Sequence, residues 1–330
     1  MKLKRNICQN RWLTRTPAGV LAAILLFAPS VLLQSCFTGI ESTPKITYKD
    51  VRRQNAGESP EQEFAGHFQA VPFSGWRPGR QFLVADARAT YTYSAPAGKS
   101  VGISLGDTLV YRGVREVPSI TGGEVAELIF TSVVSPSDSL LYRPGGNAAT
   151  LEKRDNLKLP FLVDLELVRS AGEILVGKEL VTRTGRWISP DGSQRRGRKF
   201  LKVRVTEVRA GSEDYPFLIC FSSTEDEGET GALAMSTTVN EGEPALRGFE
   251  NLFMLTDPRY NYPQITDANW ELIRQGKIAE GMTTQEVSLA LGAPRDVDRR
   301  HDQSLMYERW SYPGGVYVIF ENGLLVRYNQ

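Results

Sequence analysis

Alternating apolar and polar residues dominate the middle of the chain, from about residue 71 to residue 260. Residues 201–206 and 163–167 both place apolar side chains at every second position. This period of two is typical of strands with one buried face. Further strands are predicted, from their β-branched and aromatic content, at residues 82–84, 90–93, 108–112, 127–134, 179–184 and 216–221.

Glycine and proline separate these runs, as in Gly122-Gly123 and Pro190-Asp191-Gly192. No stretch of this region shows sustained helical periodicity. The pattern therefore predicts an all-β region, either a β-sandwich or a barrel-like domain. One β domain and two smaller β units both fit it.

The last 65 or so residues have a different pattern. Residues 267–275 are expected to form a helix. A second helix is predicted after Thr283 and Glu286, which match a capping box, and Gly292 is suited to end it. Three strands follow at residues 305–312, 316–320 and 324–328, and Asn322-Gly323 is a strong hairpin signal between the last two. The expected unit is a small α+β fold of the form ααβββ.

This C-terminal pattern resembles the SmpA/OmlA (BamE-like) domain family. The matching residues are Gly281, Met282, Thr283, Glu286, Val287, Leu291, Gly292, Pro294, Trp310, Tyr312, Phe320, Gly323 and Leu325. The resemblance implies a compact ααβββ binding module without catalytic chemistry, often carried by lipoproteins. Proteins of the BamE type are short, whereas this chain has a large β region before the module, so the resemblance covers about 65 of 330 residues.

The N-terminus has the pattern of an export signal. Five basic residues precede an apolar run at residues 20–33, which is shorter than the roughly 20 residues of a spanning helix. Leu33-Gln34-Ser35-Cys36 resembles a bacterial lipobox. The resemblance implies cleavage before Cys36 and acyl chains, palmitate among them, on that residue. The alternative is an ordinary secretory signal with a cysteine there by chance.

Four segments are expected from these patterns: a lipoprotein signal peptide at residues 1–35, a flexible tether at 36–66, the all-β domain at 67–260 and the BamE-like domain at 261–330. The leader removes five of the 39 Lys and Arg residues and none of the 38 Asp and Glu residues, which leaves a net charge of −4. A mildly acidic chain of mixed sign has no general attraction for nucleic acid or anionic lipid.

A basic run on both sides of the 190–192 turn is the candidate binding site. The tentative ligand-binding residues are Arg183, Arg186, Arg195, Arg196 and Arg198. On one hairpin they could bind phosphate or carboxylate groups, or form a solvated face neutralised by nearby acids. Trp187 is either a contact residue or part of the core. The acidic run at residues 225–229 is expected to be a solvated loop rather than a calcium site, and Cys220 a buried apolar residue.

The sequence contains few residues that match a catalytic or metal-binding motif. The two histidines, His67 and His301, fit no metal-ligand spacing, and no nucleophile elbow, phosphate loop or dinucleotide fingerprint occurs. We therefore expect no metal, no cofactor and no enzymatic activity.

The sequence predicts a lipid-anchored, non-enzymatic envelope protein of the outer membrane, a protein-interaction module in outer-membrane assembly or maintenance. Its expected partner is an outer-membrane or periplasmic protein, with no nucleic acid. It is expected to face the periplasm, because residues 37–41 contain a single acid. The alternative is a module that binds peptidoglycan, glycan or glycolipid through the basic hairpin. A third hypothesis is a tethered hydrolase that uses two carboxylates.

Overall fold

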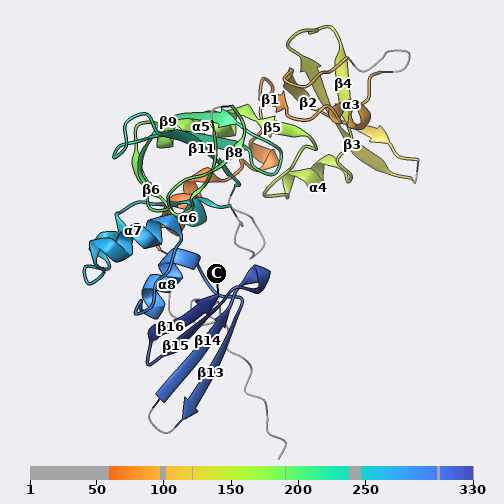
Figure 1. Cartoon of the computed structure of the whole chain (residues 1–330). Coiled ribbons are helices and arrows are strands. Elements are labelled where there is room, and N and C mark those ends of the chain that lie inside the picture. The colour runs from red at the N-terminus through yellow and green to blue at the C-terminus, as the bar shows by residue number, and fades with distance from the viewer. Residues whose placement is uncertain are drawn as a thin grey trace, which may run out of the picture. The chain divides into compact units, whose positions relative to one another are not determined.

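The computed structural model describes residues 59–96, 102–120, 122–189, 191–237, 247–302 and 305–329. Strands account for 36% of the described residues and helices for 23%, and these strands form three antiparallel sheets (Figure 1). The predicted mainly-β fold class is confirmed. Four short 3₁₀ helices occur in the same residues: η1 (Gly66–Phe68), η2 (Phe73–Gly75), η3 (Pro258–Tyr260) and η4 (Pro313–Gly315).

The first sheet has the strand order β4-β3-β2-β1-β5. Its elements are β1 (Gln81–Val84), α3 (Ala89–Thr92), β2 (Thr108–Pro118), β3 (Glu124–Ser132), β4 (Ser139–Tyr142), α4 (Ala148–Glu152) and β5 (Leu162–Asp164). In its core Phe130 packs edge to face against Phe82 and at a tilted angle against Tyr111. The prediction of a strand at residues 90–93 is wrong, because most of this segment belongs to helix α3. The N–H of Tyr93, which ends the helix, donates to the carbonyl of Ala89 at 3.0 Å.

The second sheet curls into a half-barrel with the order β12-β6-β9-β10-β11-β7-β8. Its elements are α5 (Leu165–Leu175), β6 (Glu179–Thr182), β7 (Arg186–Ile188), β8 (Gln194–Arg196), β9 (Lys202–Ala210), β10 (Phe217–Ser223), β11 (Thr230–Met235), α6 (Phe249–Leu252) and β12 (Phe253–Met254). Figure 1 shows α5 lying along this curled sheet beside β9.

Helix α5 corrects the prediction of an all-β region at residues 67–260. The predicted strand at 163–167 ends as β5 at Asp164, whose carboxylate accepts the N–H groups of Glu166 at 3.0 Å and Leu167 at 3.4 Å and caps the helix. Leu167, Ala171 and Leu175 are buried in the half-barrel core at helical spacing. The apolar–polar alternation at residues 163–167 is only five residues long, and its last three residues are also the first residues of α5.

Helix α2 (Pro60–Ala65) corrects the end of the tether predicted at residues 36–66. Ser59 and Gln62 form a capping box, and Glu61 is 8% exposed while its carboxylate accepts the N–H of Leu255 at 3.2 Å. Ala65 lies in the half-barrel core. The predicted signal peptide, Cys36 and the first part of the tether lie outside the described residues.

The third sheet, with the order β13-β14-β15-β16, packs its buried face against two helices. The elements are α7 (Asp267–Gln275), α8 (Thr284–Leu291), β13 (Asp296–Asp302), β14 (Leu305–Ser311), β15 (Tyr317–Glu321) and β16 (Leu324–Asn329). The predicted capping box of Thr283 and Glu286 is confirmed. Asn322 and Gly323 have φ angles of 49° and 82°, as a type I′ turn requires.

Strand β13 makes this unit ααββββ in the described residues, so the predicted ααβββ order is wrong by one strand. Five of its seven residues are charged, which removes the apolar alternation of a half-buried strand. An edge strand tolerates such charges, because they discourage pairing with another chain. The predicted boundary between residues 67–260 and 261–330 stays a prediction, since all described residues belong to one compact unit.

Candidate functional site

The predicted basic hairpin exists as the β7–β8 edge of the half-barrel. Arg186 lies opposite Arg196 in the register, and Trp187 lies opposite Arg195. Trp187 is 1% exposed, and its ring packs edge to face against Phe221. The tryptophan is therefore part of the core, and only the arginines remain as contact residues.

Three of the five predicted arginines are already paired. Arg195 lies 3.3 Å from the Glu229 carboxylate, and Arg198 pairs with Asp226. The Arg183 guanidinium donates to the carbonyl of Phe253 at 3.2 Å. These three side chains stabilise the half-barrel.

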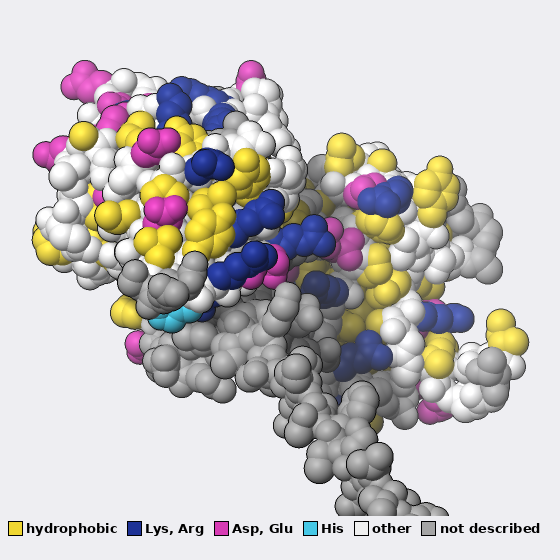
Figure 2. All heavy atoms as spheres, turned by 60° about the horizontal axis from the view of Figure 1, so that its bottom comes forward, with side chains coloured by type: hydrophobic (Ala, Val, Ile, Leu, Met, Phe, Trp, Pro, Cys, Tyr) yellow, Lys and Arg dark blue, Asp and Glu magenta, His cyan; other side chains and the backbone are white. Residues whose placement is uncertain are grey.

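The acidic loop at residues 225–229, predicted to be solvated, supplies the partners of Arg195 and Arg198. Asp226 and Glu229 face the hairpin arginines, and Glu225 pairs with Arg274 of helix α7. Figure 2 shows acidic side chains among the Lys and Arg side chains on one face of the molecule. The two charge runs of the sequence thus neutralise each other in part.

Arg186 and Arg196 have no carboxylate partner among the described residues, and Lys199 lies beside them. The Lys199 ammonium donates to the carbonyl of Ala290, near the end of α8, at 2.6 Å. A Cβ added at Gly276 would lie 3.6 Å from a terminal nitrogen of Arg196 and 3.8 Å from that same carbonyl. Arg196 and Lys199 therefore lie near the ends of α7 and α8, and Arg186 lies opposite Arg196 on the hairpin.

Substituting Lys199 with methionine should remove a pH-dependent part of the stability. Burial, and then the charges of Arg196 and Arg186, lower the pKa of Lys199 from 10.5 to about 8. Between pH 8 and pH 10.5 the unfolded wild-type chain binds more protons at Lys199 than the folded chain does. The free energy of unfolding of the wild type should therefore rise with pH, by about 3 kcal/mol relative to Lys199→Met. Denaturant unfolding of the wild type and Lys199→Met at pH 7, 8, 9 and 10 measures the difference. A difference that is constant over this range would refute the expectation.

The third sheet presents a second candidate surface. Residues opposite each other in register share a face, and Trp310, Val318, Phe320 and Leu325 point into the helical core. The alternate positions form the other face, which we call the open face; its central residues are Tyr307, Arg309, Tyr317, Ile319 and Arg327. None of these five is fully buried, and none belongs to the core that contains the described helices α7 and α8.

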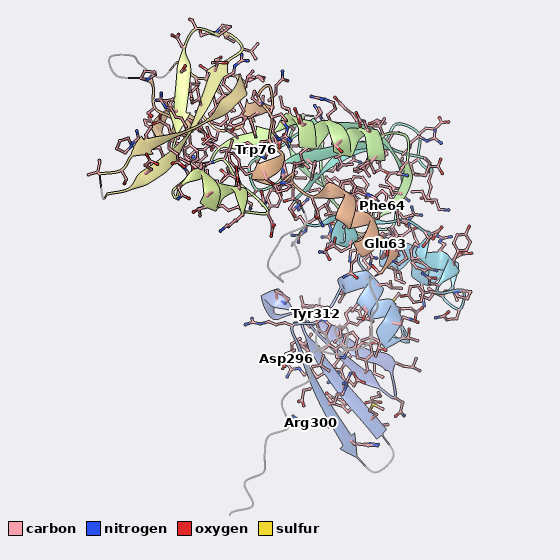
Figure 3. The ribbon with its side chains drawn as sticks, turned by 180° about the vertical axis from the view of Figure 1, so that it is seen from behind. Glu63, Phe64, Trp76, Asp296, Arg300 and Tyr312 are labelled. Atoms are coloured by element: carbon pink, nitrogen blue, oxygen red, sulfur yellow. The ribbon has the colours of Figure 1, made fainter. Side chains whose placement is uncertain are left out.

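Ile319 lies at the centre of the open face. In register it is flanked by Arg309 on β14 and by Arg327 on β16. The Arg309 guanidinium also lies over the Tyr317 ring, 5.1 Å from its centroid. Figure 3 shows Asp296 and Arg300 along β13, with Asp296 at the start of the strand and Arg300 towards its other end. The open face therefore combines aromatic, aliphatic and charged side chains.

The two edges of the same sheet are protected from strand pairing. The β13 edge carries charges, and part of the β16 edge is covered by the loop before α8. Leu325 donates its N–H to the carbonyl of Met282 at 2.7 Å and accepts the N–H of Gly281 at 2.8 Å. The charges on β13 and the occupied backbone groups of Leu325 both discourage a partner strand, so the open face is the better contact surface.

A small cavity is lined by residues of the first two cores, among them Trp76 and Val163. The carboxylate-bearing residues Asp164 and Glu213 also line it. Its volume is about 60 Å³, whereas pockets for small molecules typically measure about 300–1,000 Å³. It is therefore too small to be the substrate site of the hydrolase hypothesis.

Cys220 is half-buried rather than buried as predicted. It lies between Ile219 and Phe221, whose side chains are in the core, and its sulfur accepts from the Arg209 guanidinium at 3.1 Å.

Among the described residues, no group of three or more His, Cys, Asp or Glu side chains is arranged to bind a metal ion. None of the described helices has the length and apolar composition needed to cross a membrane.

No family model, curated protein or solved structure matches the chain. The resemblance of the C-terminal region to the SmpA/OmlA family therefore stays a prediction.

Sequence reasoning missed the open face, and it left Lys199, which belongs to the same basic run, out of the tentative ligand-binding residues. The alternation at residues 305–328 carried a signal for the open face, because Tyr307, Arg309 and Ile319 occupy positions between the buried ones. For Lys199 the sequence signal was its membership of the basic run; its contact with the end of α8 could not be predicted, because it depends on a helix far away in the sequence.

Proposed function

We propose that this chain is a lipid-anchored, non-enzymatic protein of the bacterial cell envelope that binds a protein partner through the open face. The anchor rests on the lipobox-like residues Leu33 to Cys36. The binding role rests on one observation: the open face presents tyrosine, isoleucine and arginine side chains that no described helix covers. Tyrosine and arginine are enriched among the residues that dominate the energy of protein interfaces.

The chemistry of the open face indicates the kind of partner. Ile319 offers an apolar centre between Arg309 and Arg327, so the complementary surface has an apolar patch flanked by carboxylates. An outer-membrane or periplasmic protein with such a patch fits, and a role in outer-membrane assembly or maintenance follows from the proposed location.

Photo-crosslinking tests this function. A crosslinking amino acid at position 319 or 317 should capture an outer-membrane or periplasmic protein in intact cells. The same group at Glu271, an exposed position on α7, should capture much less of that protein. Ile319→Asp should lower capture from position 317 at least about tenfold, because a buried interface anchor contributes about 2 kcal/mol or more.

Ile319 lies outside the buried core, so the substitution should leave the thermal unfolding midpoint nearly unchanged. Equal capture from positions 319 and 271, or full capture from the Ile319→Asp chain, would sink the proposal. Capture of nothing from the open face would count against it equally.

A further inference from the structure

We propose that Arg186, Arg196 and Lys199 form a binding site for a phosphate group. The site is independent of the open face, since it is built by the β7–β8 hairpin and the ends of α7 and α8. It reduces the five arginines of the predicted binding site to two, and it adds Lys199 of the same basic run.

The geometry brings the three cations together. Arg186 and Arg196 are directly opposed in register, an arrangement that destabilises a sheet when the charges are alike. Arg196 and Lys199 approach one point, because the carbonyl that accepts from Lys199 and a terminal nitrogen of Arg196 both lie within 3.8 Å of where a side chain at Gly276 would begin.

Two neighbouring arginines, in contrast, have carboxylate partners. Arg195 and Arg198, on the same hairpin and its extension, both reach carboxylates of the 225–229 loop. No described carboxylate pairs with Arg186 or Arg196. The carbonyl of Ala290 offers Lys199 only the partial negative charge of a helix C-terminus. The cluster therefore holds more positive charge than its surroundings neutralise.

A phosphate matches this cluster better than a lone carboxylate. Guanidinium groups form paired, charge-assisted hydrogen bonds with phosphate oxygens, and two opposed arginines can contact separate oxygens of one group. The lowered pKa of Lys199 is in keeping with this, because burial and the two arginines disfavour its charged form and a bound anion would raise the pKa again. The phosphate could belong to a lipid headgroup or to a soluble compound.

Titration with inorganic phosphate, at constant ionic strength with chloride as the replaced ion, is the first arm of the test. It uses the full chain with Cys36→Ser, to which no acyl chain can attach at that position. Arg186→Gln/Arg196→Gln should weaken phosphate binding at least tenfold. The matched control, Arg204→Gln/Arg209→Gln, removes the same charge from exposed positions on β9 and should weaken it less than twofold.

Flotation with vesicles is the second arm. Phosphatidylglycerol in phosphatidylcholine vesicles is compared with phosphatidylcholine alone, for the same three chains. Loss of phosphatidylglycerol binding in the Arg186/Arg196 variant alone would assign the site to a lipid headgroup; phosphate binding with no vesicle dependence would assign it to a soluble phosphate. The proposal is overturned if neither probe binds the unsubstituted chain, or if the control variant loses as much binding as the Arg186/Arg196 variant.

Discussion

Arg80→Met should destabilise the chain by about 3–5 kcal/mol. The Arg80 side chain is 5% exposed and donates to the carboxylates of Asp164 and Glu166, in each case at 2.9 Å. It precedes β1 of the first sheet, while both carboxylates lie at the start of α5 on the half-barrel. Without the guanidinium, the largely buried carboxylate of Asp164 would be left without its charge partner. Denaturant unfolding measures the loss.

The matched control for this loss is Arg88→Met. Arg88 pairs with Asp86, but its side chain is 68% exposed and solvent screens the pair, so its removal should cost much less than the removal of Arg80. Equal losses for the two variants would show that burial does not set the strength of the Arg80 pair.

The loss in Arg80→Met should also depend on pH. Burial raises the pKa of Asp164, and Arg80 opposes that rise in the wild type. Once Arg80 is removed, the folded chain retains a proton that the unfolded chain has already released. Stability of the variant then falls as pH rises through the carboxyl range. The loss should be complete at pH 7 and shrink towards pH 4. A loss of the same size at both pH values would rule out this origin.

Local signals in the sequence predicted much of the fold. The capping box at Thr283, the turn at Asn322-Gly323 and the strands at 202–206 and 217–221 each depend on neighbours a few residues away. For the same reason, helix α5 could have been found, because Leu167, Ala171 and Leu175 keep a helical period. The first residues of α5 also alternate between apolar and polar, and this short alternation led to the prediction of a strand instead of a helix.

Contacts between distant residues could not be predicted. Arg80 and Asp164 are 84 positions apart, and Lys199 and Ala290 are 91 positions apart. A charge run does not show which of its members will find an acid, so the sequence could not separate Arg186 and Arg196 from Arg195 and Arg198. The charged strand β13 was missed because an edge strand lacks the apolar pattern that identifies strands.

Cys36→Ser should move the protein from the membrane fraction to the soluble fraction of broken cells. One acyl chain gives only marginal, reversible binding, with about 0.8 kcal/mol for each buried methylene, whereas two or three chains on one residue hold a protein almost permanently. The described helices offer no other means of crossing the bilayer. Fractionation, together with the mass of the mature N-terminal peptide, measures both the location and the acylation.

Cys8→Ser is the control for the thiol itself, because Cys8 lies in the predicted leader and should be absent from the mature chain. It should leave the protein in the membrane fraction. A Cys36→Ser protein that stays with the membrane would contradict the anchor and leave the predicted location without support. If the anchor holds, protease treatment of intact cells decides the orientation, because a protein that faces the periplasm should resist digestion. A resistant, acylated chain would place both the open face and the cluster at Arg186 and Arg196 on the periplasmic side of a membrane, where protein partners and phosphate headgroups are concentrated.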